Sequence, residues 1–390
     1  MHVFRRHRSL LLASLVSAAL AACSDAPPIT GPLAQAAPSF SLGRAEGGAD
    51  PDHGGAVYTL TNAADGNSVV AFRRSGDGTL TRIGAFSTGG LGVGGTVDPL
   101  TSQFAVALSP RHDALFAVNA GSNQLSSFRV QEHGALELAS VVASGGKRPV
   151  SIAVHERLLY VLNTDDNSLQ GFRIEANARL VPITKGARSL ATGASGAAAV
   201  RFTPDGRQLV VSERVSNRLE VFRVERNGRL SEPVVSQASA GASFGFDITP
   251  HNQPIVSETQ GSVTSYALAR GGALTPITAS ISTGGTAPCW VIVTTDGKFA
   301  YATNTGTSSI AEFRVSADGK LSALAGSPKA VDAGSIPLDL DQVDGRLVYT
   351  LETGKGVIGA FLIGGDGRLT AIAEVAAGTP SSGFQGIAAF

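Results

Sequence analysis

The chain has 390 residues, of which 43% are hydrophobic and 47 are glycine, so it can bury a sizeable core and is not expected to be disordered. The 31 Lys and Arg residues are balanced by 31 Asp and Glu residues. Without an excess of positive charge there is no electrostatic footprint for a phosphate backbone, and we expect no nucleic-acid partner.

The first 22 residues have the layout of a secretory signal. Arg5, Arg6 and Arg8 precede an apolar run that is too short to span a membrane. The run ends in Leu20-Ala21-Ala22-Cys23, which resembles the bacterial lipobox and implies cleavage before Cys23 and a lipid on its sulfur. An ordinary signal with a chance cysteine is the alternative. We expect a protein of the cell envelope, anchored to the membrane by that lipid and held on the outer-membrane or periplasmic side if the organism has an outer membrane.

Three segments are therefore predicted. Residues 1–22 are the lipoprotein signal peptide, and residues 23–53, rich in Ala, Pro, Gly and Ser, are a flexible tether that begins at Cys23. Residues 54–390 form a single folded domain that is built from repeats.

An aromatic residue within a β-rich run recurs seven times, which indicates an internal repeat. The seven positions are Phe72, Phe128, Phe172, Phe222, Tyr266, Phe313 and Phe361, with spacings of 56, 44, 50, 44, 47 and 48 residues. Most copies have a second apolar run before the aromatic run, and Asp-Gly or Asn-Gly dipeptides, which favour tight hairpins, lie between many of the runs.

Each repeat is predicted to form four short antiparallel strands, named A to D. In the third copy these strands are residues 149–154, 158–162, 168–174 and 180–183. Four strands in about 40 to 50 residues are typical of a propeller blade. The fold class is therefore all-β, a seven-bladed β-propeller of four-stranded antiparallel blades, with a parallel β-helix as the weaker alternative.

The two ends of the domain complement each other. Residues 383–390 look like an A strand that no B strand follows, and residues 57–60 look like a B strand that no A strand precedes. Pairing them would close the ring through the C-terminal strand and remove the exposed sheet edges.

A polar residue follows the B strand of every repeat. These residues are Asn62, Asn119, Asn163, Glu213, Glu258, Asn304 and Glu352. In a propeller the B–C and D–A loops share one face, so the seven are predicted to ring the channel mouth on that face. At each single position, hydrogen bonding to the following turn is the alternative. The three carboxylates together would repel one another, raise at least one pKa, and attract a cation or a polar ligand.

Other candidate residues belong to the same face. Arg148 and Trp290 lie in D–A loops, and the long segment 87–103 is predicted to be a flexible flap over the mouth. Its G-x-G-x-x-G pattern lacks the strand-to-helix context of a dinucleotide site. The histidines that adjoin A–B turns, His112, His155 and His251, are predicted on the opposite face as solvated turn residues. We therefore expect no histidine-rich metal site.

The repeats resemble those of the propeller lactonase family, which includes 6-phosphogluconolactonases and carboxymuconate cyclases. The resemblance is carried by Phe202-Thr-Pro-Asp-Gly-Arg207, Leu209-Val-Val, Asn217 to Val224, and Ala302-Thr-Asn-Thr-Gly306. It implies a seven-bladed propeller over the domain, and it implies that Glu213 stands where the family has its catalytic carboxylate.

Two functional hypotheses follow. The first is a metal-independent lactone hydrolase or related cyclase, with Glu213 as general acid or base, Glu258 modulating the pKa of Glu213, and Arg148 or Arg214 holding an anionic substrate or an oxyanion. The second is a non-catalytic propeller that binds a carbohydrate, peptide or envelope component at the same mouth. The predicted ligand-binding residues are Asn62, Asn119, Asn163, Arg214, Trp290, Asn304 and Glu352. No cofactor is predicted beyond a cation at the mouth, and the protein is expected to be a monomer.

Overall fold

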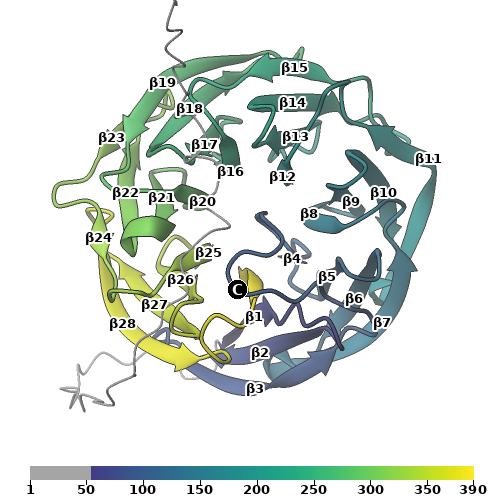
Figure 1. Cartoon of the computed structure of the whole chain (residues 1–390), viewed down its shortest axis with the longest axis horizontal. Helices are drawn as coiled ribbons and strands as arrows, with labels where there is room; N and C mark the ends of the chain where they lie inside the picture. The colour runs from purple at the N-terminus through teal and green to yellow at the C-terminus, as the bar shows by residue number, and fades with distance from the viewer. Residues whose placement is uncertain (1–53) are drawn as a thin grey trace, which may run out of the picture.

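The computed structural model describes residues 54–390, which form seven antiparallel sheets arranged in a ring (Figure 1). The predicted seven-bladed β-propeller is confirmed. The predicted signal peptide, the lipid site at Cys23 and the tether lie outside the described residues.

Each blade has four strands, which follow one another from the channel outward. Blade 1 contains β29 (Gln385–Ala389), β1 (Gly55–Leu60), β2 (Ser68–Arg74) and β3 (Leu80–Ser87). Blade 2 contains β4 (Val106–Leu108), β5 (Ala114–Asn119), β6 (Gln124–Val130) and β7 (Leu136–Ala143). Blade 3 contains β8 (Pro149–His155), β9 (Leu158–Asn163), β10 (Ser168–Ile174) and β11 (Leu180–Ser189); the first three match their predicted bounds within one residue, and β11 extends six residues beyond its predicted end. Blade 4 contains β12 (Ala197–Phe202), β13 (Gln208–Glu213), β14 (Arg218–Arg223) and β15 (Val234–Gln237).

The remaining blades follow the same plan. Blade 5 contains β16 (Ser243–Ile248), β17 (Pro254–Glu258), β18 (Ser262–Leu268) and β19 (Leu274–Ser282). Blade 6 contains β20 (Pro288–Val293), β21 (Phe299–Asn304), β22 (Ser309–Val315) and β23 (Leu321–Ala323), and β24 (Lys329–Ala330) also pairs with β22. Blade 7 contains β25 (Pro337–Val343), β26 (Leu347–Glu352), β27 (Val357–Ile363) and β28 (Leu369–Ala376). The short 3-10 turns are η1 (Glu132–Gly134), η2 (Ala176–Ala178) and η3 (Thr305–Thr307), and no helix within residues 54–390 is long and apolar enough to cross a membrane.

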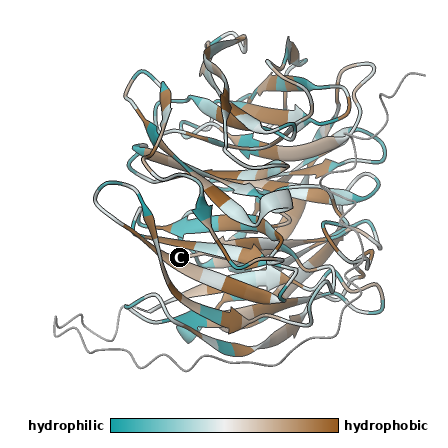
Figure 2. Ribbon diagram, turned by 60° about the vertical axis from the view of Figure 1, so that its left-hand side comes forward, coloured by the Kyte–Doolittle hydropathy of each residue, from teal (hydrophilic) through white to brown (hydrophobic). Residues whose placement is uncertain are grey.

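The core lies between the blades. All seven repeated aromatic residues are on C strands and are buried. Apolar residues are concentrated along the strands, whereas hydrophilic residues are more frequent in the turns and loops (Figure 2). Burial of these side chains is the main favourable contribution to folding, since each large apolar side chain contributes roughly 1.5–3 kcal/mol when it leaves water.

A repeated hydrogen bond joins neighbouring blades. Four buried tyrosines on B strands donate their hydroxyl groups to the carbonyl oxygen of a glycine in the C–D turn of the next blade. The pairs are Tyr58 with Gly134, Tyr160 with Gly228, Tyr301 with Gly367, and Tyr349 with Gly78, at 3.0, 2.5, 2.6 and 2.8 Å. All four glycines have positive φ, between 80° and 92°, which is why the sequence has Gly at these turns.

The C-terminal strand closes the ring, as predicted. Strand β29 pairs antiparallel with β1, with Val57 opposite Ala389 and Tyr58 opposite Ala388. Beyond the strand, the Ala56 amide donates to the Phe390 carbonyl oxygen at 3.1 Å, and Arg74 Nε donates to the same oxygen at 2.9 Å. Blade 1 is therefore built from both ends of the domain, which leaves no open edge at the junction.

The segment 87–103, which we call the plug, is not a flexible flap; that prediction is wrong. Leu100, Ser102 and Gln103 are buried at 2%, 1% and 0% exposure. The segment runs inside the ring next to β4, in dark blue in Figure 1.

Hydrogen bonds connect the plug to four blades. Ser102 Oγ donates to the Val150 carbonyl oxygen in blade 3 at 2.8 Å, and Gln103 N donates to the Ala198 carbonyl oxygen in blade 4 at 3.1 Å. Gln103 Nε2 donates to Val291 O in blade 6 at 2.7 Å, and Gln385 Oε1 in blade 1 accepts from Leu100 N at 3.1 Å. The plug is ordered because its polar groups find partners on several A strands, which a local sequence pattern does not encode.

Candidate functional site

The seven polar residues that follow the B strands are all buried. Their exposures are 0% or 1%. Each bonds within the loops around it: Asn62 Oδ1 accepts from Val93 N at 3.1 Å, Asn119 Nδ2 donates to Ser126 Oγ at 2.7 Å, and Asn304 Nδ2 donates to Ser309 Oγ at 3.1 Å. Asn163 Nδ2 has longer contacts with Ser168 Oγ and Ser144 O, at 3.4 and 3.5 Å. These contacts fit the turn-stabilising alternative.

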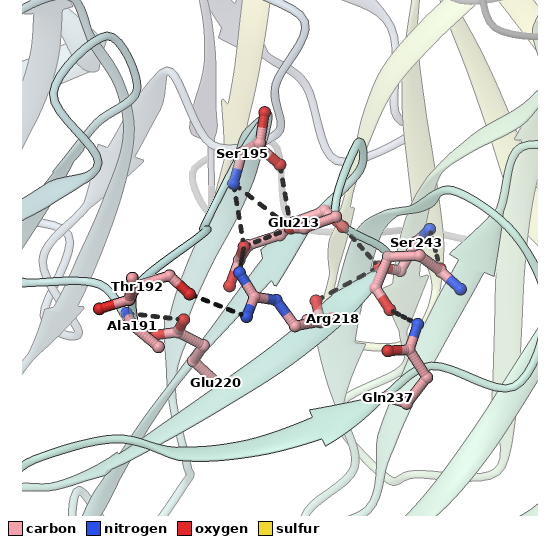
Figure 3. A network of polar contacts seen from close by, with 10 residues as sticks. Ala191, Thr192, Ser195, Glu213, Arg218, Glu220, Gln237 and Ser243 are labelled. Carbon is pink, nitrogen blue, oxygen red and sulfur yellow. Dashed lines mark hydrogen bonds and ion pairs between the residues drawn. The ribbon is translucent and has the colours of Figure 1, made fainter.

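Glu213 lies in a polar network that holds the D–A loop before blade 4 (Figure 3). Its Oε2 accepts from Ser195 N at 3.1 Å, from the Ser216 hydroxyl, and from Arg218 Nη2 at 3.4 Å. Glu220 accepts from Ala191 N at 2.9 and 3.1 Å. Burial, reinforced by the neighbouring Glu213 carboxyl, raises the pKa of Glu220 to about 8.

Glu258, the second glutamate of the ring, is held in the same way. Glu258 Oε1 accepts from Ala240 N at 2.9 Å and from Thr264 Oγ1 at 2.8 Å. Burial is the main cause that raises the pKa of Glu352 to about 7. The charges that act on Glu352 are those of Glu374, Lys355 and Asp332, so its raised pKa does not come from Glu213 or Glu258.

Arg148 and Trp290 both contact the plug, and Trp290 lies in strand β20 rather than in the predicted D–A loop. Arg148 Nη2 donates to the Pro99 carbonyl oxygen at 2.8 Å. Trp290 is fully buried, donates from Nε1 to the Ser102 carbonyl oxygen at 2.8 Å, and packs edge-on against Phe244. Burial raises the pKa of Asp98, a plug residue, and the charge of Arg214 lowers it. The predicted channel mouth is therefore occupied by the chain itself.

A large hollow opens on the opposite face. It is a cavity of about 880 Å³, which we call the cup, formed by the C-terminal ends of A strands and by A–B turns. Its ionisable lining residues are Arg74, Arg201, Asp247, Asp341, Asp344, His112 and His155. Phe104, the residue after the plug, also lines it. The volume is within the range of small-molecule sites.

Arg201 and two aspartates form the charged centre of the cup. Arg201 Nε lies 2.7 Å from Asp247 Oδ1, and the guanidinium stacks 4.5 Å from the centre of the Phe104 ring. The Arg201 side chain is 43% exposed, whereas the Asp247 side chain is 8% exposed. Asp247 also accepts from Ile248 N at 2.8 Å and from Val293 N at 3.0 Å, so it is a fixed anchor for the arginine.

Asp341 is the third residue of the charged centre of the cup. It accepts from Gln342 N at 2.8 Å and from Ala389 N at 2.9 Å, one bond on each oxygen. Burial raises its pKa to about 6; the two backbone donors and the Arg201 charge oppose this, and the Asp247 charge adds to it. A carboxylate with this pKa, at the wall of a cavity, can take a proton from water near neutral pH.

The histidines on this face are rim residues. His112 stacks on Phe390 with ring centres 4.9 Å apart, and burial lowers its pKa. His155 lies tilted over Phe202 at 5.7 Å. Within residues 54–390, no group of three or more His, Cys, Asp or Glu residues could hold a metal ion.

Sequence reasoning missed the cup, although a signal was present. Arg201 and Asp247 each stand two residues before the threonine that begins the A–B turn, Thr203 or Thr249. The equivalent positions before Ser109 and Thr294 are Ala107 and Ile292. A charged residue where other repeats have a small or apolar one is therefore the mark of this site.

Fold and site together define a seven-bladed propeller whose channel is plugged at one end and has a charged cup at the other. The family model for the seven-bladed β-propeller lactonases matches residues 58–187, 178–287 and 250–332. The chain belongs to this family, as the sequence resemblance indicated.

Curated relatives are distant. A 6-phosphogluconolactonase of Yersinia pseudotuberculosis is 24% identical over 174 residues, which are 43% of this chain and 52% of that protein. One from Yersinia enterocolitica is 26% identical over 126 residues, 32% of this chain and 38% of that protein. The chain thus spans about half the length, or less, of these curated relatives.

Solved structures share the fold. The periplasmic gluconolactonase of Pseudomonas aeruginosa has a TM-score of 0.67 and 18% identity, covering 86% of this chain and 99% of that one. Virginiamycin B lyase of Staphylococcus aureus has a TM-score of 0.52 and 12% identity, covering 71% of this chain and 86% of that one. At these identities the similarity is evidence for the architecture alone.

Proposed function

We propose that the protein is an exported, lipid-anchored lactonase that opens a lactone ring in the cup. The observation that carries the proposal is the convergence of Arg201, Asp247 and Asp341, from three different blades, on one cavity of about 880 Å³. Membership of the lactonase family and the name of the Yersinia relatives support the reaction class.

In this mechanism Asp341 is the general base. Its carboxylate takes a proton from a water molecule, whose oxygen attacks the carbonyl carbon of the lactone. Arg201 binds to Asp247 through Nε, and its terminal nitrogens stabilise the oxyanion that forms on the carbonyl oxygen. The ring C–O bond then breaks, and the leaving oxygen takes the proton back from Asp341. The product is a hydroxy acid, and no oxidant or cofactor is consumed.

The family resemblance implied Glu213 as the catalytic carboxylate, and that role stays a prediction. Glu213 is fully buried, and its Oε2 already accepts from Ser195 in the D–A loop, Ser216 in the B–C turn and Arg218 on β14. A water molecule and a lactone would both need access to it. The cup offers such access at Asp341, so the geometry favours the cup.

The deciding experiment compares Asp341→Asn with Glu213→Gln in the purified full-length protein. A panel of lactones is followed by pH-stat, with melting temperatures as the folding control. We expect Asp341→Asn to lower kcat on the order of a hundredfold to ten-thousandfold, and Glu213→Gln to keep turnover. Loss of turnover in a folded Glu213→Gln variant, with normal turnover in Asp341→Asn, would place the chemistry at the plugged face. Ligand binding without any turnover would support the non-catalytic propeller instead.

Lipid anchoring rests on Leu20-Ala21-Ala22-Cys23. If Cys23 is the lipid site, labelled palmitate is incorporated into the wild type, and Cys23→Ser abolishes the label and releases the protein into the soluble fraction or stalls its processing. A wild type that never incorporates palmitate contradicts the anchor, although it leaves the enzymatic proposal intact.

A further inference from the structure

We infer that the substrate of the cup is an uncharged lactone with an alkyl substituent, not a sugar phosphate. This inference rests on the proposed function, because it names the substrate class of the same site. Three features of the cup support it: its net charge, its engaged polar groups and the aliphatic side chains in its wall.

The first feature is charge. The lining contains two arginines, Arg74 and Arg201, against three aspartates, Asp247, Asp341 and Asp344. Arg201 is already paired with Asp247, and Arg74 Nε donates to the Phe390 carbonyl oxygen. A phosphate dianion entering this cavity would meet a net negative charge, and sites that bind phosphate instead present uncompensated basic groups or backbone amides.

The second feature is that three polar side chains of the cup, Ser109, Thr203 and Gln342, are engaged by the protein. Ser109 Oγ donates to Asp113 at 2.7 Å, and Thr203 Oγ1 donates to Asp205 at 2.6 Å. Gln342 Oε1 accepts from Gly345 N at 2.7 Å. A sugar has a hydroxyl on nearly every carbon and would lose hydrogen bonds to water that these residues could not replace.

The third feature is a set of aliphatic side chains in the wall of the cup. Val106, Leu108, Ile152, Val154, Ile248 and Ile387 line the cup from several blades. Leu108 and Val154 are half-buried, so part of their surface is available to a ligand. An alkyl chain placed against such a wall gains roughly 0.8 kcal/mol for each methylene that leaves water.

The position of the chain termini agrees with an apolar substrate. Gly54, where the tether joins the folded domain, lines the cup together with Phe390. If Cys23 is lipidated as proposed, the chain that carries the lipid enters the folded domain at Gly54, in the lining of the cup. An alkyl lactone concentrates in or near a lipid surface, because transfer of its chain from water is favourable.

The test measures kcat/KM of the full-length protein for γ-butyrolactone, γ-octalactone, γ-decalactone and 6-phosphoglucono-δ-lactone. We expect kcat/KM for the γ-lactones to rise by roughly fourfold per added methylene until the aliphatic side chains of the wall are covered. The value for the phosphorylated lactone should be the lowest of the four. Equal values along the γ-lactone series, or a higher value for the phosphorylated lactone, would overturn the inference while leaving lactonase activity established.

Matched variants assign the selectivity to the cup. Leu108→Gln should lower kcat/KM for γ-decalactone by roughly tenfold, whereas Leu362→Gln, on the outward face of β27 at 42% exposure, should not. Asp344→Lys changes the charge of the cup by two units and should raise kcat/KM for the phosphorylated lactone, whereas Asp318→Lys in a distant turn should not. If the two Leu→Gln variants had equal effects, and the two Asp→Lys variants had equal effects, the cup would not determine the substrate selectivity.

A failure of the proposed function is distinguishable from a failure of this inference. If no lactone is hydrolysed, the proposed function is wrong, and calorimetry with the same compounds still tests the ligand class. Tighter binding of γ-decalactone than of the phosphorylated lactone would support an apolar ligand, and the reverse order would overturn it.

Discussion

Arg201 and Asp247 occupy equivalent positions on the A strands of neighbouring blades, and their side chains form an ion pair with Nε 2.7 Å from Oδ1. Asp247 is fixed by two backbone amides, whereas the arginine side chain is 43% exposed. The buried partner therefore orients the accessible one. This pair and Asp341 are electrostatically coupled, which makes the site testable by titration.

The pH dependence of kcat/KM in the wild type should follow the titration of Asp341. Because its pKa is raised to about 6, the basic form predominates only above that pH. We expect kcat/KM to fall about tenfold per pH unit below pH 6 and to level off above it. A profile that stays flat from pH 5 to 8 would contradict a role for Asp341 as the base.

Neutralising Asp247 and neutralising Arg201 should shift the pKa of Asp341, and with it the midpoint of the acid limb of kcat/KM, in opposite directions. The Asp247 charge raises the pKa of Asp341, so Asp247→Asn should lower it, and the Arg201 charge lowers the pKa, so Arg201→Gln should raise it. The acid limb of kcat/KM is the measurement, with NMR titration of the carboxyl if Arg201→Gln is too slow. Asp113→Asn, at an exposed turn, is the control. Shifts of the same sign would refute the coupling.

The raised pKa of Glu220 predicts how the free energy of unfolding depends on pH. Its pKa is about 8 in the folded protein against 4.5 ordinarily, so the folded state holds a proton that the unfolded state releases. The contribution of this proton to the free energy of unfolding is fully present below pH 4.5 and is lost as the pH rises through 8. Glu220→Gln keeps an acceptor for Ala191 N and removes the titration. We expect its melting temperature to exceed that of the wild type by several degrees at pH 9.

The control for this prediction is Glu137→Gln, which alters an exposed carboxylate on β7. Its melting temperature should follow the wild type across the pH range, because an exposed ion pair contributes little. Parallel curves for wild type and Glu220→Gln would show that Glu220 does not titrate as described.

The plug should contribute to global stability. Gln103 is fully buried, and its side chain bonds Val291 O at 2.7 Å. Gln103→Ala leaves that carbonyl group without its partner and creates a cavity, which should cost about 2–4 kcal/mol in the free energy of unfolding. Gln131→Ala, an exposed residue on the turn before η1, should cost less than about 0.5 kcal/mol. Denaturant unfolding of both variants measures the difference, and equal costs would mean that the plug is dispensable.

Deleting residues 385–390 removes β29 and opens blade 1. The deletion exposes the edge of β1 and removes Ala389 N, a donor to Asp341. We expect loss of soluble protein or a melting temperature lower by more than about 10 °C, since an uncapped apolar edge favours aggregation. A soluble chain with unchanged melting would be incompatible with closure through the C-terminal strand.

The sequence by itself determined the blades. Strand alternation, the repeated aromatic residue and the Asp-Gly turns are local signals, so the first three strands of blade 3 were predicted within one residue, and closure followed from counting A and B strands. The positions of His112 and His155 near the A–B turns, opposite the face that carries Glu213, also followed from strand order.

Only the tertiary structure decided which end of the channel is open. Asn62, Glu213 and Trp290 look like mouth residues in the sequence, because a polar or aromatic residue at a strand end is compatible with either solvent or a buried hydrogen bond. Their burial depends on the plug and the D–A loops, whose partners can lie far away in the sequence, as for Leu100 and Gln385, which are 285 residues apart. Contacts between residues so distant in sequence leave no periodic trace, and the cup at Arg201 is formed at the end of the channel that the plug leaves open.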